Sequence, residues 1–247
     1  MTFFGNSIWQ LVYQSDKITW FVLLTLLTLS IICWTLFFYK LITWRSKKAQ
    51  FENVISNMKH VHNFENLYFL TSRFTNSVPG FFLTKNLNFL KNLKETQNNK
   101  TQFSDREWDF LQYNLDSSVD SIMNQEEKEL PVFSVVAAIS PLLGLFGTVW
   151  GLVHAFIDIS KKQSADITTV APGLAEALIT TLAGLLVAIP ALSMYYYLKM
   201  KSGNIEQLLL TLSDKFLAVT HKIFFQSSME IDKCAYVEEK VEPSLQK

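Results

Sequence analysis

The chain has 247 residues, of which 49% are hydrophobic and 14% aromatic, and its 22 basic and 22 acidic residues give a formal net charge of zero. Nothing in this balance indicates a nucleic-acid partner, because phosphate backbones are bound by clustered basic residues. The eight glycines form neither a GxxxxGK[ST] nor a GxGxxG pattern, and no serine has a convincing His and Asp context. His60 and His62 lack the nearby Cys or acidic residues of a metal site, so we expect solvated histidines. The sequence therefore predicts a protein that is not an enzyme and holds no cofactor.

Three apolar runs dominate the chain, at residues 18–39, 130–157 and 167–198, and only Glu176 interrupts them with a charge. A helix that crosses a bilayer needs about 20 predominantly apolar residues, so each run is long enough to span. The first run is too long for a signal-peptide core and has no basic segment before it and no A-x-A cleavage site. We therefore expect all three spans to be present in the working protein.

The basic residues beside these runs indicate the orientation in the membrane. One set of flanks carries Lys40, Arg45, Lys47, Lys48, Lys128, Lys199 and Lys201. The other set carries Lys17, Lys161 and Lys162. Because cytoplasmic loops are enriched in Lys and Arg, we expect the first set inside the cell and the N-terminus outside. The Lys161–Lys162 pair opposes this assignment, since it lies in a short exported loop.

Threonines are frequent in the first run, at Thr19, Thr25, Thr28 and Thr35. A threonine hydroxyl in a helix can donate to the carbonyl one turn earlier. We expect these side chains to satisfy themselves in this way and to face lipid, in preference to lining a channel.

The region between the first two runs is predicted to be helical. Residues 46–71 place Phe51, Val54, Ile55, Met58 and Val61 on one helix face. A break is expected at Val78-Pro79-Gly80, followed by a short helix over 81–93 and a polar linker over 95–102.

A capping box, Ser104-Asp105-Arg106-Glu107, predicts the start of another helix. We expect this helix to run into the membrane, kinked but not ended by Pro131 and Pro141. The third membrane helix is likewise expected to continue past Tyr197, and the charged tail after Ser227 is expected to be disordered.

Small residues mark one face of the helices predicted over 140–191. The first helix contributes Gly144, Gly147 and Gly151; the second contributes Gly173, Ala177, Gly184 and Ala188. Lipid gives apolar helices no hydrophobic reason to associate, so close packing of small faces must supply the attraction. The sequence therefore predicts a tightly packed pair of membrane helices.

The runs SPLLGLFGTVWG and VAPGLAEALITTLAGLLVAIPA resemble the signature of the TolQ/ExbB/MotA family of proton-channel subunits. The resemblance covers residues 134–197, and LFGTVWGLVHAF with the short N-terminus is more similar to the TolQ branch than to the ExbB branch. It implies a pentameric ring around a dimeric single-span partner like TolR, whose membrane aspartate carries the proton. The ring would pass work to a TolA-like protein that reaches toward the outer envelope.

Thr148 and Thr181 are expected to lie at one depth, near the bilayer midplane. On spacing alone two hypotheses are open: the hydroxyls support a chain of water, or each bonds to its own backbone and keeps the interface small. The family resemblance favours the first, because both positions match polar threonines of the family's channel lumen.

Glu176 lies about 7 Å of helix rise outward from Thr181. A carboxylate within a span is costly unless it faces water or a polar partner, which makes Glu176 a candidate for the proton pathway. Thr180, one turn away, could bond to it. A purely structural link between helices is an equally open alternative, and His154 and Asp158 are expected at the interface.

The predicted fold is an all-α membrane protein with three transmembrane helices, the second and third extended into a cytoplasmic helical bundle. The expected segments, in chain order, are periplasmic 1–17, transmembrane 18–39, cytoplasmic helical 40–129, transmembrane 130–158, periplasmic 159–167, transmembrane 168–198 and cytoplasmic 199–247. The expected location is the bacterial inner membrane, with protons as the transported ion.

The predicted function is a stator-like proton-channel subunit of a motor that maintains the outer envelope and supports cell division. An ExbB-like subunit that energises TonB-dependent uptake is the alternative within the family. A passive helical membrane scaffold is the alternative of another class, and it would need no polar lumen.

Overall fold

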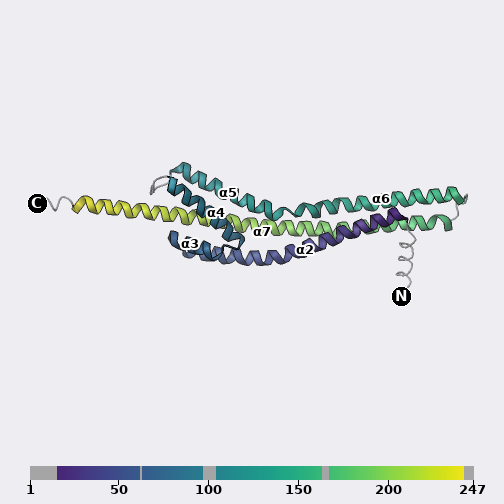
Figure 1. Cartoon of the computed structure of the whole chain (residues 1–247), viewed down its shortest axis with the longest axis horizontal. Coiled ribbons are helices and arrows are strands. Elements are labelled where there is room, and N and C mark those ends of the chain that lie inside the picture. The colour runs from purple at the N-terminus through teal and green to yellow at the C-terminus, as the bar shows by residue number, and fades with distance from the viewer. Residues whose placement is uncertain (1–15, 62, 97–103, 163–166, 242–247) are drawn as a thin grey trace. The chain divides into compact units, whose positions relative to one another are not determined.

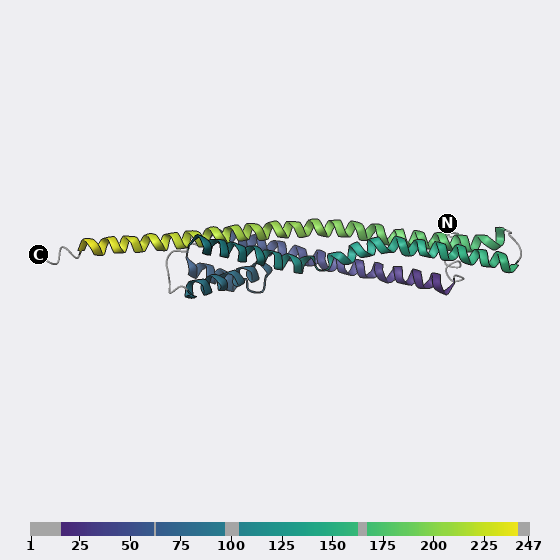
Figure 2. The same cartoon turned by 90° about the horizontal axis from the view of Figure 1, so that it is seen from above.

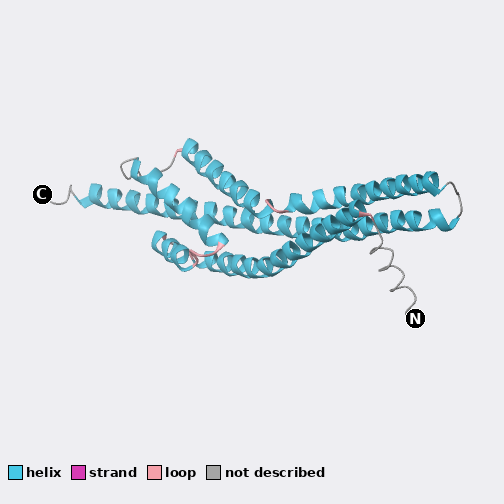
Figure 3. Ribbon diagram, turned by 45° about the vertical axis from the view of Figure 1, so that its right-hand side comes forward, coloured by secondary structure: helices cyan, strands magenta, loops and turns pink. Residues whose placement is uncertain are grey.

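The computed structural model describes residues 16–61, 63–96, 104–162 and 167–241, and every regular element in these ranges is helical (Figures 1 and 3). The elements are α2 (Lys17–Asn57), the short 3₁₀ helix η1 (Met58–His60), α3 (Phe64–Arg73), α4 (Val78–Thr96), α5 (Asp105–Glu127), α6 (Leu130–Lys162) and α7 (Ile167–Val241). The all-α prediction is confirmed.

Three of these helices are long and apolar enough to cross a membrane: Lys17–Asn57, Leu130–Lys161 and Val170–Phe225. Helices α2, α6 and α7 contain the three apolar runs of the sequence, so the prediction of three candidate spans is also confirmed. α6 reaches Lys162 and α7 begins at Ile167, which makes the connection between them shorter than the expected loop over 159–167.

The chain divides into two compact units. Unit 1 comprises Met1–Leu41 and Glu127–Met200, and unit 2 comprises Ile42–Glu126 and Lys201–Lys247. Helices α2 and α7 each contribute their first part to unit 1 and their later part to unit 2. The candidate functional residues all belong to unit 1.

In unit 1, α2 buries a narrow stripe of its surface. Thr19, Val22, Leu26 and Cys33 are nearly inaccessible to solvent. Around Cys33 the core is completed by Phe133 of α6 and by residues of α7 such as Ala191. Spacings of three, four and seven residues return to the same helix face, so one side of α2 packs against α6 and α7.

The opposite faces of the three helices in unit 1 expose large apolar side chains. These include Phe21, Leu24, Leu27, Ile31, Leu142, Leu145, Val149, Leu178, Leu182 and Leu186. A soluble monomer rarely exposes so continuous an apolar surface. Lipid or other protein helices must therefore cover these faces.

The hydroxyls of three α2 threonines donate to carbonyls of their own helix, as predicted. Thr25 donates to the Phe21 carbonyl, Thr28 to Thr25 and Thr35 to Ile31, each at 2.8 Å. Thr19 differs, because it is buried and its hydroxyl has no hydrogen-bond partner in the structure.

The expected continuous helix from 104 into the membrane is wrong. α5 ends at Glu127, residues 128 and 129 form a turn, and α6 begins at Leu130. Pro131 explains the break, because proline has no N–H and its ring clashes with the carbonyl four residues earlier, here that of Glu127. In the first turn of α6 the missing N–H costs nothing. Pro141, in contrast, lies inside α6 and the helix continues through it.

Ion pairs hold both sides of this turn. In unit 1, Lys199 of α7 binds Glu127 at 2.8 Å. In unit 2, Lys47 of α2 binds Glu126 at 2.5 Å, and both of these side chains are largely buried. The Lys199–Glu127 pair is partly exposed and contributes at most about 1 kcal/mol, so it orients the turn more than it stabilises the fold.

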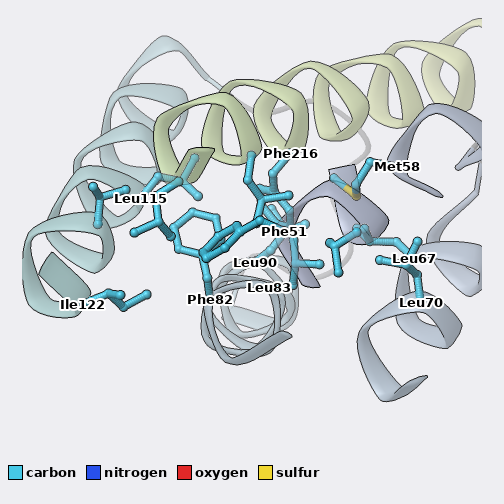
Figure 4. Close-up of a cluster of buried hydrophobic side chains, with 14 of the residues drawn as sticks. Phe51, Met58, Leu67, Leu70, Phe82, Leu83, Leu90, Leu115, Ile122 and Phe216 are labelled. Atoms are coloured by element: carbon cyan, nitrogen blue, oxygen red, sulfur yellow. The ribbon is translucent and has the colours of Figure 1, made fainter. Parts of the chain in front are cut away.

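Unit 2 is a helical bundle with one apolar core. Phe51 of α2, Phe82 of α4, Leu115 of α5 and Phe216 of α7 are fully buried there (Figure 4). Four of the five residues predicted on one face of 46–71 are buried and Ile55 is partly buried. That segment is not one helix, however, because α2 ends at Asn57 and α3 starts only at Phe64.

Proline and capping residues set two helix starts in unit 2. The expected break at 78–80 is the beginning of α4, with Pro79 in the first turn where proline is tolerated. At α5, the carboxylate of Glu107 accepts the Ser104 N–H at 2.6 Å, which is the reciprocal bond of the predicted capping box. α7 continues to Val241, through the first part of the tail that the sequence predicts to be disordered.

Candidate functional site

The candidate site is the contact between α6 and α7 in unit 1, which run side by side in two views (Figures 1 and 2). At its centre Gly144 of α6 faces α7 so closely that an added Cβ would lie 3.0 Å from the Thr180 carbonyl oxygen. An added Cβ at Gly184 would lie 2.6 Å from the Ser140 carbonyl oxygen. Both obstacles are backbone atoms, which cannot rotate away. The two backbones are in contact here, and a side chain at Gly184 would force one helix to move.

The contact continues toward the 163–166 connection with the same small residues. A Cβ on Gly151 would lie 3.0 Å from the Ala177 side chain, and one on Gly173 would lie 3.0 Å from the Ala155 side chain. Gly147 faces the side chain of Thr180, whose hydroxyl oxygen would be 2.5 Å from an added Cβ. The structure thus places the small residues, together with the buried Ala188, on the packed sides of α6 and α7 within one chain.

Two hydroxyls of α7 converge on one carbonyl of α6. Thr181 donates to the Gly144 oxygen at 3.3 Å. Thr180 donates to the same oxygen at 3.4 Å and to the Ala177 oxygen of its own helix at 2.7 Å. Gly144 exposes this carbonyl because it has no side chain. The two bonds link the helices across their closest approach.

Thr148 is placed differently from Thr181. Its hydroxyl donates to the Leu145 carbonyl of its own helix at 2.6 Å. Both side chains remain partly exposed, whereas Thr180 is fully buried. A partly exposed hydroxyl that donates one bond still has lone pairs to accept from water or a partner.

Glu176 is partly buried, and its Oε1 accepts the backbone N–H of Asp16 at 3.2 Å. The Asp16 carboxylate in turn accepts the Trp150 indole N–H at 2.9 Å. Thr180 does not make the bond to Glu176 that the sequence suggested, because its hydroxyl is directed to the two carbonyls described above. Glu176 therefore belongs to a network that joins the start of α2 to α6 and α7.

The Trp150 hydrogen bond is the main reason that the pKa of Asp16 lies below its ordinary value, and the nearby His154 lowers it further. Asp16, just ahead of α2, is therefore a carboxylate at physiological pH. His154 and Asp158 form an i, i+4 pair with 3.9 Å between Nδ1 and Oδ2, an ion pair only when the imidazole is protonated.

Sequence reasoning missed the roles of Asp16, Trp150 and Thr180. Asp16 had a usable signal, since an Asp directly before an apolar run is a preferred helix N-cap. Trp150 and Thr180 had no distinguishing signal, because only the relative rotation of α6 and α7 decides which side chains meet. Among the described residues, no group of three or more His, Cys, Asp or Glu side chains could hold a metal ion.

Three candidate spans, apolar outer faces and a glycine-lined helix contact with hydroxyls define a multi-pass membrane protein of the channel type. The chain belongs to the MotA/TolQ/ExbB proton channel family, whose sequence model matches residues 83–210. This range includes α5, α6 and the part of α7 in unit 1, so the candidate site lies in the family's shared region. Members of this family transport protons and are not enzymes.

The relatives differ in how much of the chain they match. The Tol-Pal system protein TolQ of Haemophilus influenzae is 44% identical over 107 residues, which are 42% of this chain and 47% of the relative. TolQ of Pseudomonas aeruginosa is 42% identical over 105 residues, 41% of this chain and 46% of the relative. These matches thus span about half the length of either relative. The biopolymer transport protein ExbB of Salmonella typhimurium is 26% identical over 227 residues, 92% of this chain and 88% of the relative.

Proposed function

We propose that this chain is the TolQ-like channel subunit of a bacterial inner-membrane motor. The motor uses the proton gradient to drive a TolA-like protein and so maintains outer-envelope integrity and cell division. The observation that carries the proposal is the α6–α7 contact, where Thr181 reaches the exposed Gly144 carbonyl and keeps a partly exposed hydroxyl. Higher identity to TolQ than to ExbB supports the choice within the family.

The proposed proton pathway uses Thr148, Thr181 and Glu176. The two hydroxyls hydrogen-bond water at the middle of the spans, and Glu176 lies toward the 163–166 connection. Within the three apolar runs of the sequence, Glu176 is the only acidic residue. A carboxylate that carries the proton past the threonines must come from another chain, which fits a TolR-like single-span partner.

The proposed assembly is a pentamer around a dimer of that partner. The exposed apolar faces of α2, α6 and α7 are covered in it by neighbouring subunits and by lipid. The small residues between α6 and α7 give each subunit a rigid helix pair, because backbones in contact cannot slide without steric overlap.

The proposed topology puts residues 1–17 and 159–167 in the periplasm and residues 40–129 and 199–247 in the cytoplasm, with spans over 18–39, 130–158 and 168–198. Single cysteines at Ser164 and Ser117, without Cys33 and Cys234, test it. We expect an impermeant thiol reagent to label position 164 in intact cells and position 117 only after lysis. Position 117 is exposed on α5, so burial would not hide it. Labelling of position 117 in intact cells would contradict the three-span arrangement.

Complementation tests the function. The chain is expressed in cells that lack their own TolQ and ExbB, and detergent resistance and TonB-dependent uptake are measured. Restored detergent resistance, with co-purification of the TolR-like protein, is the expected result. Restored uptake alone would establish the ExbB-like alternative, which the long ExbB match favours. Proton flux must accompany either activity. If an assembled complex carries no proton flux, both channel hypotheses are wrong and the passive-scaffold alternative remains.

A further inference from the structure

Asp16 stands directly before α2 and closes the first turn of that helix. Its carbonyl accepts the Trp20 N–H at 3.0 Å. Within unit 1 it also reaches both other helices, donating its N–H to Glu176 of α7 and accepting from Trp150 of α6. One residue thus links the start of α2 to one side chain within α6 and one within α7.

Each of the two carboxylates in this network accepts a hydrogen bond from its own donor. The Asp16 carboxylate accepts the Trp150 indole N–H, and the Glu176 carboxylate accepts the Asp16 backbone N–H. The other charged groups in the neighbourhood are Lys17 on α2, the His154 and Asp158 pair on α6, and Glu176 on α7. Indole nitrogen only donates, so Trp150 can hold a carboxylate but cannot carry a proton away from it.

We propose that Asp16 is a positioning residue for Glu176: anchored by Trp150, it orients the Glu176 carboxylate for proton transfer at the end of the pathway nearest the 163–166 connection. The inference rests on the proposed function. Proton transfer requires an oxygen within hydrogen-bond reach of the donor water or acceptor, and a freely rotating glutamate spends much of its time out of reach. The Asp16 amide restricts Glu176, and Asp16 is itself restricted by Trp150.

Three substitutions separate this role from helix capping. Trp150→Phe keeps an aromatic ring and removes only the donor. Asp16→Ser keeps a good N-cap residue but is too short to keep the bond to the indole. Asp16→Asn keeps both the cap and an oxygen that accepts from Trp150, but removes the negative charge.

The measurement is proton uptake into vesicles that contain the complex purified through a tag on this chain, followed with a trapped pH-sensitive dye over a range of outer pH. We expect Trp150→Phe and Asp16→Ser to lower the maximal rate by about tenfold, the usual effect of losing a hydrogen bond to a charged group. Asp16→Asn should conduct at the same maximal rate as the unmodified complex. It should shift the half-maximal outer pH downward by about half a unit, because the lost negative charge no longer attracts protons.

The reference variant is Glu176→Gln, which should lower the rate on its own. If it does so while Trp150→Phe and Asp16→Ser conduct normally, the positioning role is wrong and the proposed channel stands. If Asp16→Asn leaves the pH profile unchanged and the other two variants reduce the yield of assembled complex, Asp16 is structural only. If the unmodified complex takes up no protons beyond empty vesicles, the proposed function fails and this inference fails with it.

Discussion

Replacing Thr181 by valine is expected to abolish proton-driven function while the subunit still folds and binds its partner. Valine has nearly the shape of threonine, so the packing against α6 is kept. The hydroxyl that faces the proposed pathway is lost, and an apolar constriction tends to lose its water. We expect cells that carry Thr181→Val to become sensitive to detergent, with unchanged co-purification of the TolR-like protein.

The bond from Thr181 to the Gly144 carbonyl requires a control, because valine also removes this link between the helices. Thr180→Val is the matched variant, since Thr180 donates to the same carbonyl but is fully buried. Each bond between membrane helices contributes about 0.6 kcal/mol on average, so Thr180→Val should be tolerated. Thr181→Ser, which keeps the hydroxyl, should retain substantial function.

Thr148→Val should have a weaker effect than Thr181→Val, because Thr148 makes a short 2.6 Å bond within its own helix, whereas the 3.3 Å bond of Thr181 to Gly144 is more easily exchanged for water. Detergent survival of cells with each variant, at equal protein level, orders the four substitutions. Full resistance with an assembled Thr181→Val complex would show that the hydroxyl is dispensable. Equal defects in the Thr180 and Thr181 variants would assign the effect to helix packing instead.

Replacing Gly184 by leucine is expected to separate α6 from α7 and to break up the complex. Even a Cβ at this position would lie 2.6 Å from the Ser140 carbonyl oxygen and 3.1 Å from the Gly144 Cα. These are backbone atoms, so one helix must move as a whole. Overpacking typically costs about 1–3 kcal/mol, and a clash with backbone atoms falls at or above the upper end of that range. We expect a lower melting temperature in detergent and a smaller complex by native mass spectrometry.

Gly203 provides the matched control on the same helix, because nothing lies within 4 Å of a Cβ added there. Gly203→Leu should leave the complex intact and stabilise α7 by about 0.5–1 kcal/mol, since glycine is a poor helix former. An unchanged complex with Gly184→Leu would show that the α6–α7 contact does not hold the subunit in its assembled form. If both Gly184→Leu and Gly203→Leu lose stability, leucine destabilises α7 at either position, and the loss does not report on the α6–α7 contact.

Much of the fold could be predicted because membrane helices have strong local signals. Their length follows from bilayer thickness, and Gly or Ala at every third or fourth position marks a packed face. The predictions that proved wrong concern where helices end. The expected helix through Pro131 is two helices, and the expected single helix over 46–71 ends at Asn57, because ends depend on capping and packing as well as periodicity.

The residue sequence by itself determined which parts of this protein are long and apolar enough to cross a membrane, which faces are small enough to pack, and which polar groups lie within those apolar runs. These properties depend on composition and on the 3.6-residue helical period alone. Only the tertiary structure decided that Thr180 shares the Gly144 carbonyl with Thr181, and that Asp16 bonds to both Trp150 and Glu176. Such contacts join residues more than 30 positions apart. Their geometry depends on how far each helix is rotated about its own axis, and that rotation is selected by the steric fit of glycine against backbone.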